Sequence, residues 1–277
     1  MNRREFTRMM ALAGAATTVP RTFAWAAAES PTLQEIKDRG ALRIGVFSGT
    51  EPYYHKDLAT GKWSGFCVSM AEDLAAQIGV KLQTVDTTWG NAVLDLQARK
   101  IDVMFGLSAN PERAKVVDFS ETLMDNTFTA LSRADFPVTN WADLNKPEVR
   151  VAVDLGSTQD VFARRELPNC TLVALKGAED TNLALRSGRA DAIIQVALLA
   201  VVTAKNLGPD YKLTVPEPRA SQPTTIGMRK EPDAAFRAYI NDWLAQRRAD
   251  GKVSEWVVQS LEVVGVTPDM LPANLTF

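Results

Sequence analysis

Histidine is almost absent from this chain of 277 residues, because His55 is the only one. A Ser-His-Asp triad therefore has one possible base, and a zinc site built from several histidines is excluded. The two cysteines, Cys67 and Cys170, do not have the spacing of a metal-binding pair. No phosphate-binding loop of the form G-x-x-x-x-G-K-S/T is present, and no dinucleotide fingerprint follows the first predicted strand. The sequence predicts no cofactor and no metal, and it gives an enzymatic function little support.

Long apolar runs and basic patches are also missing. After residue 28 no segment is long and apolar enough to cross a membrane. Lysine and arginine number 31 and the acids 33, which gives a net charge of −2, and no basic run follows the first few residues. A basic face is the electrostatic footprint of nucleic-acid binding, so the sequence predicts no nucleic-acid partner.

The first residues have the order of an export signal. Arg3 and Arg4 begin a twin-arginine motif, an apolar stretch covers residues 9–19, and mostly small residues fill positions 24–28. A basic start, an apolar middle and a small-residue cleavage site predict a signal peptide, and the paired arginines indicate the Tat route. We therefore expect residues 1–28 to be a Tat signal peptide and the product to be a soluble periplasmic protein. The alternative is an amphipathic N-terminal helix of a cytosolic protein.

Apolar periodicity predicts alternating strands and helices in the N-terminal half of the chain. Strands are expected at residues 41–46, 80–85 and 101–105, and helices at residues 69–78 and 92–98. Alternation of this kind is typical of an α/β fold with largely parallel sheets.

A weak internal repeat extends this pattern to the rest of the chain. Residues 96–105 resemble residues 185–194, because each segment has a helix end, a basic turn, an aspartate and an apolar strand. Upstream of them, residues 42–46 resemble residues 149–153. The repeat predicts two similar α/β lobes, with a binding site in the crevice between them. The alternative is that strand–helix–strand units simply look alike.

Two connectors separate the predicted lobes. Residues 132–143 lead into the second set of elements, and residues 215–224 contain three prolines, which exclude a helix there. Two crossings form a two-segment hinge, which suits closure around a ligand. A long amphipathic helix is expected at residues 232–249. The expected division is the signal peptide at 1–28, the first part of lobe 1 at 29–132, lobe 2 at 133–220, and the return to lobe 1 with C-terminal helices at 221–277.

The two cysteines fall in different predicted lobes. Cys67 and Cys170 lie 103 residues apart, and an exported protein could pair them in a disulfide. Such a bridge would lock the lobes together and prevent closure around a ligand. We therefore expect two buried free thiols.

The strongest local constellation lies at residues 106–113, GLSANPER. An Asn-Pro pair there is typical of the N-cap and first position of a helix. Free backbone N–H groups at a helix start favour an anion, and Arg113 could bind a carboxylate through two parallel hydrogen bonds. The hydroxyl of Ser108 is a further donor. The alternative is a capped helix whose arginine is solvated, or pairs with Glu112 or Asp118.

Residues 101–120, IDVMFGLSANPERAKVVDFS, resemble the signature of the extracellular solute-binding proteins of family 3, which are periplasmic receptors for polar amino acids that serve ABC transporters. The family pattern is an Asp-led strand, a small-residue loop, T-x-x-R and then x-x-V-x-F-S. The resemblance covers nearly the whole chain after the expected signal peptide. It implies a type II periplasmic binding protein fold, with a mostly parallel sheet flanked by helices in each lobe. Further matching segments are residues 40–46, 65–66, 89, 156–159, 188–192 and 250–252.

The resemblance also implies which residues contact the ligand. Arg113 takes the place of the family's carboxylate-binding arginine. Gly106 and Ser108 match loop positions that contact the ligand. Thr158, together with Ser157, matches the lobe 2 loop that reaches the same carboxylate after closure.

The aromatic wall implied by the resemblance is partly altered. Trp89 matches an apolar or aromatic wall of the family's pocket, although plain core packing is the alternative. Tyr53 keeps the second of two aromatics that often flank prolines in the family, while Thr50 replaces the first. The acidic positions of the family's G-F-D-x-D segment are Cys67 and Ser69 here.

Val196 holds the place of the family's ammonium-binding aspartate. A valine side chain accepts no hydrogen bond, and an unpaired buried ammonium is costly. We therefore expect carboxylate binding without recognition of a standard α-amino acid. Glu51 or Asp154 is an alternative partner for an ammonium, or each is an exposed loop acid. Gln195 offers a neutral amide to a ligand that has no amine.

Together these features predict a monomeric, non-catalytic periplasmic protein that binds a small carboxylate-bearing solute, an organic acid or an amino-acid derivative. Its expected partner is the permease of an ABC importer. One alternative is an enzyme, because exported cyclohexadienyl dehydratases resemble this family. Such an enzyme needs a carboxylic acid in the cleft, and Glu51 is the only tempting candidate for it. The other alternative is a sensor that signals to a membrane receptor.

Overall fold

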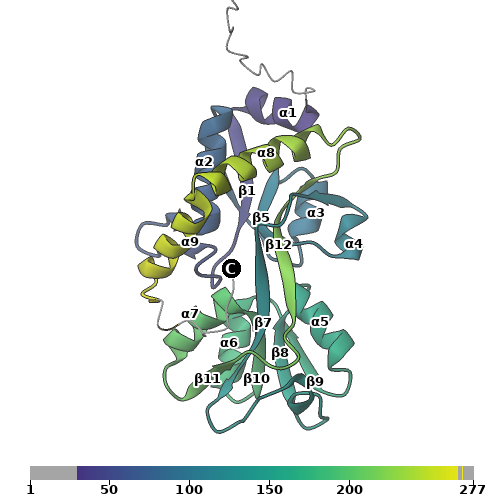
Figure 1. Ribbon diagram of the computed structural model, residues 1–277, viewed down its shortest axis with the longest axis vertical. Coiled ribbons are helices and arrows are strands. Elements are labelled where there is room, and N and C mark those ends of the chain that lie inside the picture. Colours follow the sequence, from purple (N-terminus) through teal and green to yellow (C-terminus); the bar gives the residue numbers. More distant parts are fainter. Residues whose placement is uncertain (1–29, 268–269, 271–277) are drawn as a thin grey trace, which may run out of the picture.

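The computed structural model describes residues 30–267 and residue 270, so the predicted signal peptide at 1–28 lies outside the described residues. The described chain forms two lobes that are stacked along the long axis of the molecule (Figure 1). Both lobes are α/β, as expected. Within this part of the chain, no helix combines the length and the apolar character that a membrane span requires.

Lobe 1 is built on three parallel strands in which the first strand of the chain is central. β1 (Ala41–Val46) lies between β4 (Lys81–Asp86) and β5 (Val103–Ser108). β12 (Ser221–Arg229) continues the sheet in the antiparallel direction and carries β6 (Val117–Phe119) beside it. The other elements of lobe 1 are α1 (Pro31–Arg39), α2 (Phe66–Ile78), α3 (Ala92–Gln97), α4 (Pro111–Ala114), α8 (Ala235–Ala249), α9 (Lys252–Val263) and the hairpin of β2 (His55–Lys56) and β3 (Trp63–Ser64).

Lobe 2 repeats this arrangement of strands. β8 (Arg150–Asp154) lies between β9 (Thr171–Leu175) and β10 (Ala192–Val196), and all three are parallel. The internal repeat in the sequence therefore corresponds to a repeat in the fold. The other elements of lobe 2 are α5 (Thr158–Glu166), α6 (Ala178–Arg186), α7 (Ala197–Leu207), β11 (Tyr211–Thr214) and the 3-10 turn at Trp141–Asp143.

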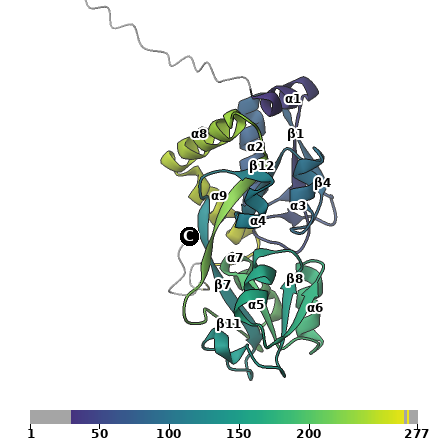
Figure 2. The ribbon, with the colours of Figure 1, turned by 90° about the vertical axis from the view of Figure 1, so that its right-hand side faces the viewer.

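One long strand, β7 (Met124–Arg133), passes from lobe 1 into lobe 2. Its first residues pair with β12, and from Phe128 onward it pairs with β10 and β11. The chain returns through β12, so β7 and β12 run along one side of the molecule between the lobes (Figure 2). The boundary expected at residue 132 lies near the end of β7, where Ser132 pairs with Ala192 of lobe 2.

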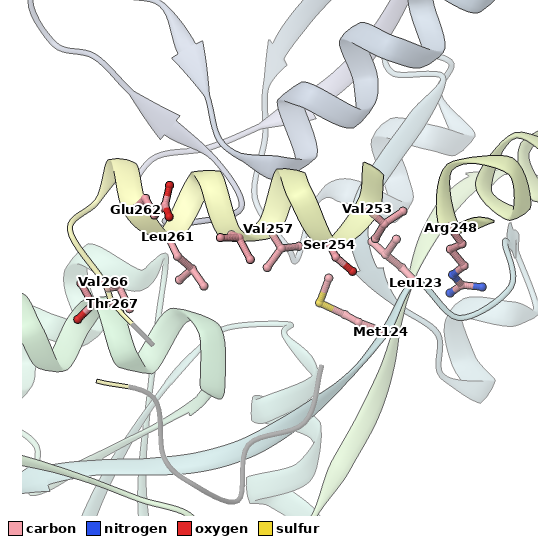
Figure 3. A pocket seen from close by; sticks show the side chains of 11 residues that line it. Leu123, Met124, Arg248, Val253, Ser254, Val257, Leu261, Glu262, Val266 and Thr267 are labelled. Carbon is pink, nitrogen blue, oxygen red and sulfur yellow. The ribbon is translucent and has the colours of Figure 1, made fainter. Parts of the chain in front are cut away.

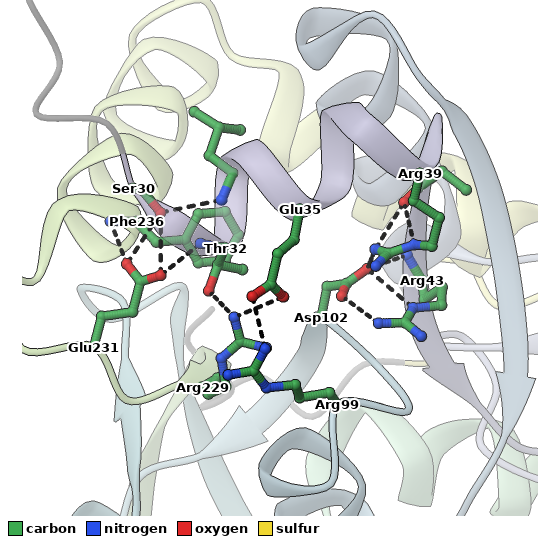
Figure 4. Close-up of polar contacts among 12 residues, drawn as sticks. Ser30, Thr32, Glu35, Arg39, Arg43, Arg99, Asp102, Arg229, Glu231 and Phe236 are labelled. Carbon is green, nitrogen blue, oxygen red and sulfur yellow. Dashed lines mark hydrogen bonds and ion pairs between the residues drawn. The ribbon is translucent and has the colours of Figure 1, made fainter.

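The repeated aspartate has the same structural role in both lobes. Asp102 accepts hydrogen bonds from the backbone N–H and the guanidinium of Arg43, at 2.8 and 2.9 Å. Asp191 accepts from the corresponding groups of Arg150, at 2.8 and 2.6 Å. Each aspartate thus ties the entry of the third strand to the start of the first. Asp102 is further enclosed by the guanidinium of Arg39 (Figure 4).

Helix α1 is attached to the returning chain by polar contacts. Ser30 is its N-cap and accepts from the backbone of Leu33 at 3.1 Å. The carboxylate of Glu231 accepts from the N–H of Thr32 at 2.7 Å, and Arg229 donates to the Thr32 hydroxyl at 2.6 Å (Figure 4). These bonds connect the beginning of the described chain to the segment that follows β12.

Several elements differ in length from the sequence predictions. α2 begins at Phe66 rather than at residue 69, because Gly65, with φ of 108°, turns the chain directly into the helix. β5 continues to Ser108, where a loop was expected, because Ser108 pairs with Thr224 of β12. α8 begins at Ala235 rather than at residue 232. Pairing with a distant strand leaves no local pattern in the sequence.

Both cysteines are free, and they lie in different lobes. Cys67 is buried in α2 of lobe 1, whereas Cys170 is half-buried just before β9 of lobe 2. The prediction of free thiols is confirmed, although only Cys67 is fully enclosed.

Candidate ligand-binding site

A small cavity lies where the two lobes and the hinge strand meet. Its volume is about 20 Å³, which is room for about one water molecule. An organic acid therefore requires the lobes to move apart at this point. The residues that line it are Tyr53, Trp89, Gly106, Ser108, Arg113, Asn126, Ser157, Thr158, Gln159, Val196 and Leu199.

Eight of the ten residues expected at the site line this cavity, and two lie elsewhere. Gln195 is buried on β10, where successive side chains point to opposite faces, so it points away from the cavity that Val196 lines. Its backbone oxygen accepts from the Thr129 hydroxyl at 2.9 Å. Glu51 lies in a separate cavity and pairs with Nδ1 of His55 at 3.2 Å.

Arg113 is held in the cavity wall with its charge buried. Only 9% of the residue is exposed, and burial lowers its pKa to about 10, so the guanidinium stays charged at neutral pH. Nη1 donates to the backbone oxygen of Ser108 at 2.8 Å, and Nη2 donates across the lobe boundary to the oxygen of Gly156 at 2.9 Å. The guanidinium therefore touches both lobes.

No carboxylate among the described residues pairs with Arg113. Glu112 is bound to Lys115 at 2.6 Å, and Asp118 lies 3.9 Å from Arg237. The alternative in which Arg113 pairs with Glu112 or Asp118 is therefore wrong. A buried guanidinium whose only partners are carbonyl oxygens is suited to an anion that comes from outside the chain.

The N-cap expected before Arg113 is present, but the helix is a single turn. The side chain of Asn110 accepts from the backbone N–H of Arg113 at 2.8 Å, and Pro111 follows at the first helical position. α4 has only four residues, so the macrodipole that favours anions at helix starts is small here. Arg113 itself is the main source of positive charge at the cavity.

Two aromatic rings form the lobe 1 wall. Tyr53 and Trp89 meet edge to face, with ring centres 6.4 Å apart. Gly106 makes their position possible, because a Cβ at this residue would lie 2.9 Å from the Tyr53 ring and 3.4 Å from the Trp89 ring. Trp89 also packs against Phe47, with ring centres 4.6 Å apart. Trp89 thus serves both as a cavity wall and in the core.

The lobe 2 wall is the turn that starts α5. Ser157 is the N-cap and accepts from the backbone N–H of Asp160 at 3.2 Å. The carboxylate of Asp160 accepts in return from the N–H of Gly156 at 3.0 Å. This pair of bonds fixes the Gly156 carbonyl that Arg113 reaches. Thr158, the first residue of α5, is 7% exposed at the cavity.

Sequence reasoning missed three residues of the lining, namely Asn126, Gln159 and Leu199. Asn126 lies on the hinge strand β7 and donates to the Tyr53 hydroxyl and to Thr224, which fixes Tyr53 against the hinge. Gln159 directly follows the predicted Ser157-Thr158 pair, so its place in the matching segment was an available signal. Leu199 reaches the cavity from α7, and no local pattern distinguishes it from a core leucine.

The cavity lining contains no aspartate, glutamate or histidine. Burial also raises the pKa of the Tyr53 hydroxyl, which therefore stays neutral at physiological pH. Arg113 is thus the one charged group of the lining, and the polar groups around it are hydroxyls, amides and backbone atoms.

A larger, apolar groove lies away from this site. It has a volume of about 270 Å³ and runs along α9, next to Leu123 and Met124 at the start of β7 (Figure 3). Its one cation, Arg248, is exposed, so an anion there would be screened by water. The smaller cavity around Arg113 is therefore the better candidate for an anionic ligand.

Asp154 lies close to the site but outside its lining. It ends β8, and burial raises its pKa to about 7, with the nearby acids Asp160 and Asp180 adding to the effect. The backbone N–H of Gly177 bonds its carboxyl group and opposes the shift. The side chain is therefore an enclosed acid of lobe 2 rather than an exposed loop acid.

Comparison with known proteins places the chain in one family. The model of the bacterial extracellular solute-binding proteins, family 3, matches residues 42–259. L-cystine-binding protein TcyJ of Escherichia coli (strain K12) is 27% identical over 253 residues, which cover 91% of this chain and 92% of that protein. Cyclohexadienyl dehydratase of Pseudomonas aeruginosa is 26% identical over 241 residues, covering 85% of this chain and 88% of the enzyme.

A solved structure agrees with this placement. The crystal structure of an ancestral amino acid-binding protein, a precursor of cyclohexadienyl dehydratase, is 33% identical in sequence and has a TM-score of 0.76. The match covers 82% of this chain and 98% of that one. Because the family model also matches well over half of the chain, this protein belongs to the bacterial extracellular solute-binding proteins, family 3.

Proposed function

We propose that this chain is a periplasmic solute-binding protein that closes its two lobes around a small carboxylate and delivers it to the permease of an ABC importer. The observation that carries the proposal is the buried guanidinium of Arg113, which lines an interlobe cavity and has only carbonyl partners among the described residues. A ligand carboxylate would supply the missing negative charge. Residues 1–28 would act as the Tat signal peptide, and the exported protein would work as a monomer.

Each lobe contributes its own part to the proposed site. Arg113 would bind the carboxylate through two parallel hydrogen bonds, exchanging its carbonyl partners for carboxylate oxygens. Ser108 and Thr158 would donate hydroxyl hydrogen bonds from opposite lobes. Gly106 and Ser157 would bring their backbone close to the ligand. Tyr53 and Trp89 would enclose its apolar part.

Ligand binding in this scheme shifts an equilibrium between open and closed arrangements of the lobes. A cavity of about 20 Å³ is too small for any organic acid, so entry requires hinge motion at β7 and β12. The ligand would then favour the arrangement in which both lobes contact it. The permease would recognise that arrangement.

The proposed solute is an organic acid or an amino-acid derivative rather than a standard α-amino acid. Val196 lines the cavity beside Arg113, and the lining has no carboxylate to hold an α-ammonium. One relative of this chain is named as a cystine-binding protein and another as a dehydratase. Ligands and activities therefore vary among the relatives. Replacement of an ammonium-binding aspartate by a valine is a direct way to change which ligand the site binds.

Thermal-shift screening of small carboxylates tests the proposal. The best ligand is expected to raise the melting temperature of the wild-type protein but not that of Arg113→Ala. Arg113→Lys keeps the charge without the planar fork and should retain part of the shift. If the best ligand stabilises the wild type and Arg113→Ala equally, the assigned role of Arg113 is wrong.

The similarity to cyclohexadienyl dehydratase makes an enzyme the second candidate. General acid catalysis needs a proton donor within reach of the substrate, and the cavity lining offers only the hydroxyls of serine and threonine and a tyrosine whose raised pKa makes it a poor proton donor. Glu51 lies in another cavity. Incubation with prephenate or arogenate is therefore expected to give no aromatic product, and turnover of either compound would overturn the non-catalytic proposal.

A further inference from the structure

We propose that a second interlobe cavity receives a cationic group at the far end of the ligand, so that the solutes are elongated carboxylates with a distal ammonium or guanidinium. This assignment rests on the proposed function, in which Arg113 holds the carboxylate. The second cavity has a volume of about 480 Å³ and has walls from both lobes. Among its lining residues are Glu51 of lobe 1 and Glu179, Thr203 and Asn206 of lobe 2.

The two cavities share one face of helix α7. Leu199 lines the small cavity around Arg113, whereas Thr203 and Asn206 line the larger one. Residues separated by three, four or seven positions lie on the same face of an α-helix. With a rise of 1.5 Å per residue, Leu199 and Asn206 are roughly 10 Å apart along the axis. A ligand that follows this face therefore needs an extended chain between its two ends.

Carboxylates outnumber cations in the walls of the larger cavity. Its ionisable residues are Glu51, Asp57 and Glu179, with Lys56 and His55. Lys56 already lies over a tryptophan ring, 5.1 Å from the ring centre. The excess of negative charge favours a cation over a second carboxylate at this end of the ligand.

Glu179 brings negative charge from lobe 2 onto lobe 1. A Cβ at Gly49 would lie 2.8 Å from Cγ of Glu179, so this side chain rests against the lobe 1 loop. A cation bound next to Glu179 would therefore contact both lobes at once. It would support the same closed arrangement as the carboxylate at Arg113.

An unpartnered hydroxyl in the wall is an independent sign of a polar ligand. Thr203 is only 7% exposed, and no side chain or backbone group of the described chain hydrogen-bonds its hydroxyl. The hydroxyl oxygen is not fully enclosed, so it can be reached from the cavity that Thr203 lines. Asn182 also lines the cavity, and its Oδ1 is buried without a partner in the described part of the chain. The N–H groups of an ammonium or guanidinium are suited to a hydroxyl oxygen in this position.

The inner cavity explains why the cation would be distal. Val196 stands beside Arg113 and accepts no hydrogen bond, so an ammonium on the α-carbon has no partner there. The outer cavity supplies interlobe carboxylates that a ligand amine could reach by a longer chain. Solutes with the amine at the far end, such as ω-amino acids, satisfy both cavities.

Calorimetric titration with matched ligand pairs tests this assignment. The probes are 4-aminobutanoate, 6-aminohexanoate and 8-aminooctanoate, each compared with the plain fatty acid of the same length. At one chain length or more, the amine should bind at least about fivefold tighter than the plain acid, as expected for a partly exposed ion pair. Glu179→Gln should reduce this ratio to about one. Glu166→Gln, an exposed lobe 2 acid outside the cavity, should keep it.

Equal binding of amine and plain acid at every length would overturn the assignment, and so would a ratio that survives Glu179→Gln. Failure of the proposed function has a different signature. In that case Arg113→Ala would leave the binding of the plain carboxylates unchanged, and the distal site would lose its basis as well.

Discussion

In the proposed site, Val196 is the residue whose chemistry would decide between an α-amino acid and a carboxylate without an α-amine. It is 6% exposed in the cavity wall beside Arg113. A carboxylate at this position would give an α-ammonium a charged acceptor, whereas the valine leaves it unpaired. Under the proposed function, the choice between these two ligand classes would therefore depend on this one side chain.

Substitution of Val196 by aspartate is expected to favour α-amino acids. We compare glutamine with its des-amino analogue, glutaramate, by calorimetry. The wild type should bind glutaramate at least as well as glutamine. In Val196→Asp the preference should shift toward glutamine by about tenfold, the value of one charge-assisted hydrogen bond.

Val196→Asn is the control, because it adds a polar side chain without the charge and should shift the preference much less. Micromolar binding of glutamine by the wild type would contradict the assigned role of Val196. A shift of equal size in the asparagine variant would show that charge is not the cause.

Residues of the site could be predicted where they lie in continuous segments with local chemistry. Residues 106–113 combine a strand end, an N-cap and an arginine, and Gly106, Ser108 and Arg113 of this segment line the cavity. Asn126 and Leu199 could not be predicted, because β7 and α7 bring them to the cavity only through tertiary packing. Gln195 was placed on the wrong face, since a shift of one residue along a strand reverses the direction of the side chain.

At the scale of elements, the repeated Arg-Asp pair fastens the strands of each lobe. The two pairs have the same geometry but differ in exposure, because the side chain of Asp102 is 1% exposed and that of Asp191 is 23% exposed. Asp102 also pairs with a second arginine, Arg39. Loss of the more buried carboxylate leaves two guanidinium groups and a backbone N–H without their acceptor.

Asp102→Ala is therefore expected to destabilise the protein more than Asp191→Ala. We expect about 3 kcal/mol for Asp102→Ala, as for breaking a buried pair, and about 1 kcal/mol for Asp191→Ala, as for a half-exposed one. Urea unfolding followed by circular dichroism measures both values. Equal losses would contradict the difference in burial as the cause.

Asp154, at the end of β8, is predicted to contribute a stability that falls as pH rises. The pKa of Asp154 is raised to about 7 in the folded protein, mainly by burial, and an unfolded aspartate has a pKa of about 3.9. Between these values the folded state binds more protons than the unfolded state, so stability is lost as pH increases through this range.

Asp154→Asn should remove this dependence, because the amide is neutral at every pH and its oxygen can still accept from Gly177. The variant should therefore melt at a higher temperature than the wild type at pH 8, and at a similar temperature at pH 4. Asp180→Asn serves as the control, since it removes only a minor cause of the shift. A difference in melting temperature between Asp154→Asn and the wild type that does not grow from pH 4 to pH 8 would contradict the raised pKa of Asp154, whereas the wild-type trend alone also contains the opposite contribution of Asp191, whose pKa is lowered by its bonds to Arg150.

The likeness of the two lobes could be predicted from the repeat, whereas the order of the strands was not predicted and the hinge could be predicted only in outline. Parallel units with the same motif produce the same order, with β1 and β8 in the centre. No local sequence pattern predicts the extent of β7, because its first half pairs in one lobe and its second half pairs in the other. A continuous strand through both sheets depends on how the lobes are joined.

At the scale of the whole molecule, a few contacts hold the lobes together on the side of the site. Arg113 reaches the Gly156 oxygen at 2.9 Å, and Lys205 of α7 donates to the Val264 oxygen at the end of α9 at 2.5 Å. The backbones of Gly90 and Gly156 also touch, since a Cβ at Gly156 would lie 2.8 Å from Cα of Gly90. Closure therefore depends on glycine at this boundary.

Gly90→Val is expected to weaken ligand binding without unfolding either lobe. A Cβ at residue 90 would lie 3.2 Å from the Leu155 oxygen across the boundary, and a valine adds two methyl groups to it. Gly90 is exposed and does not have a positive φ, so the open arrangement should accept the substitution. Under the proposed function the ligand binds the closed arrangement, so a cost of about 1.4 kcal/mol for closure would lower the affinity tenfold.

Calorimetry with the best carboxylate measures this loss, and small-angle scattering at a ligand concentration near the wild-type Kd should show a larger radius of gyration for Gly90→Val than for the wild type. Gly61→Val is the control, because a Cβ at Gly61 meets no atom within 4 Å, although its φ of 70° costs some stability. The control should therefore melt lower but bind normally, whereas Gly90→Val should melt normally in the absence of ligand but bind weakly. Normal affinity in Gly90→Val would mean that the ligand does not require the lobes to meet at Gly90 and Gly156.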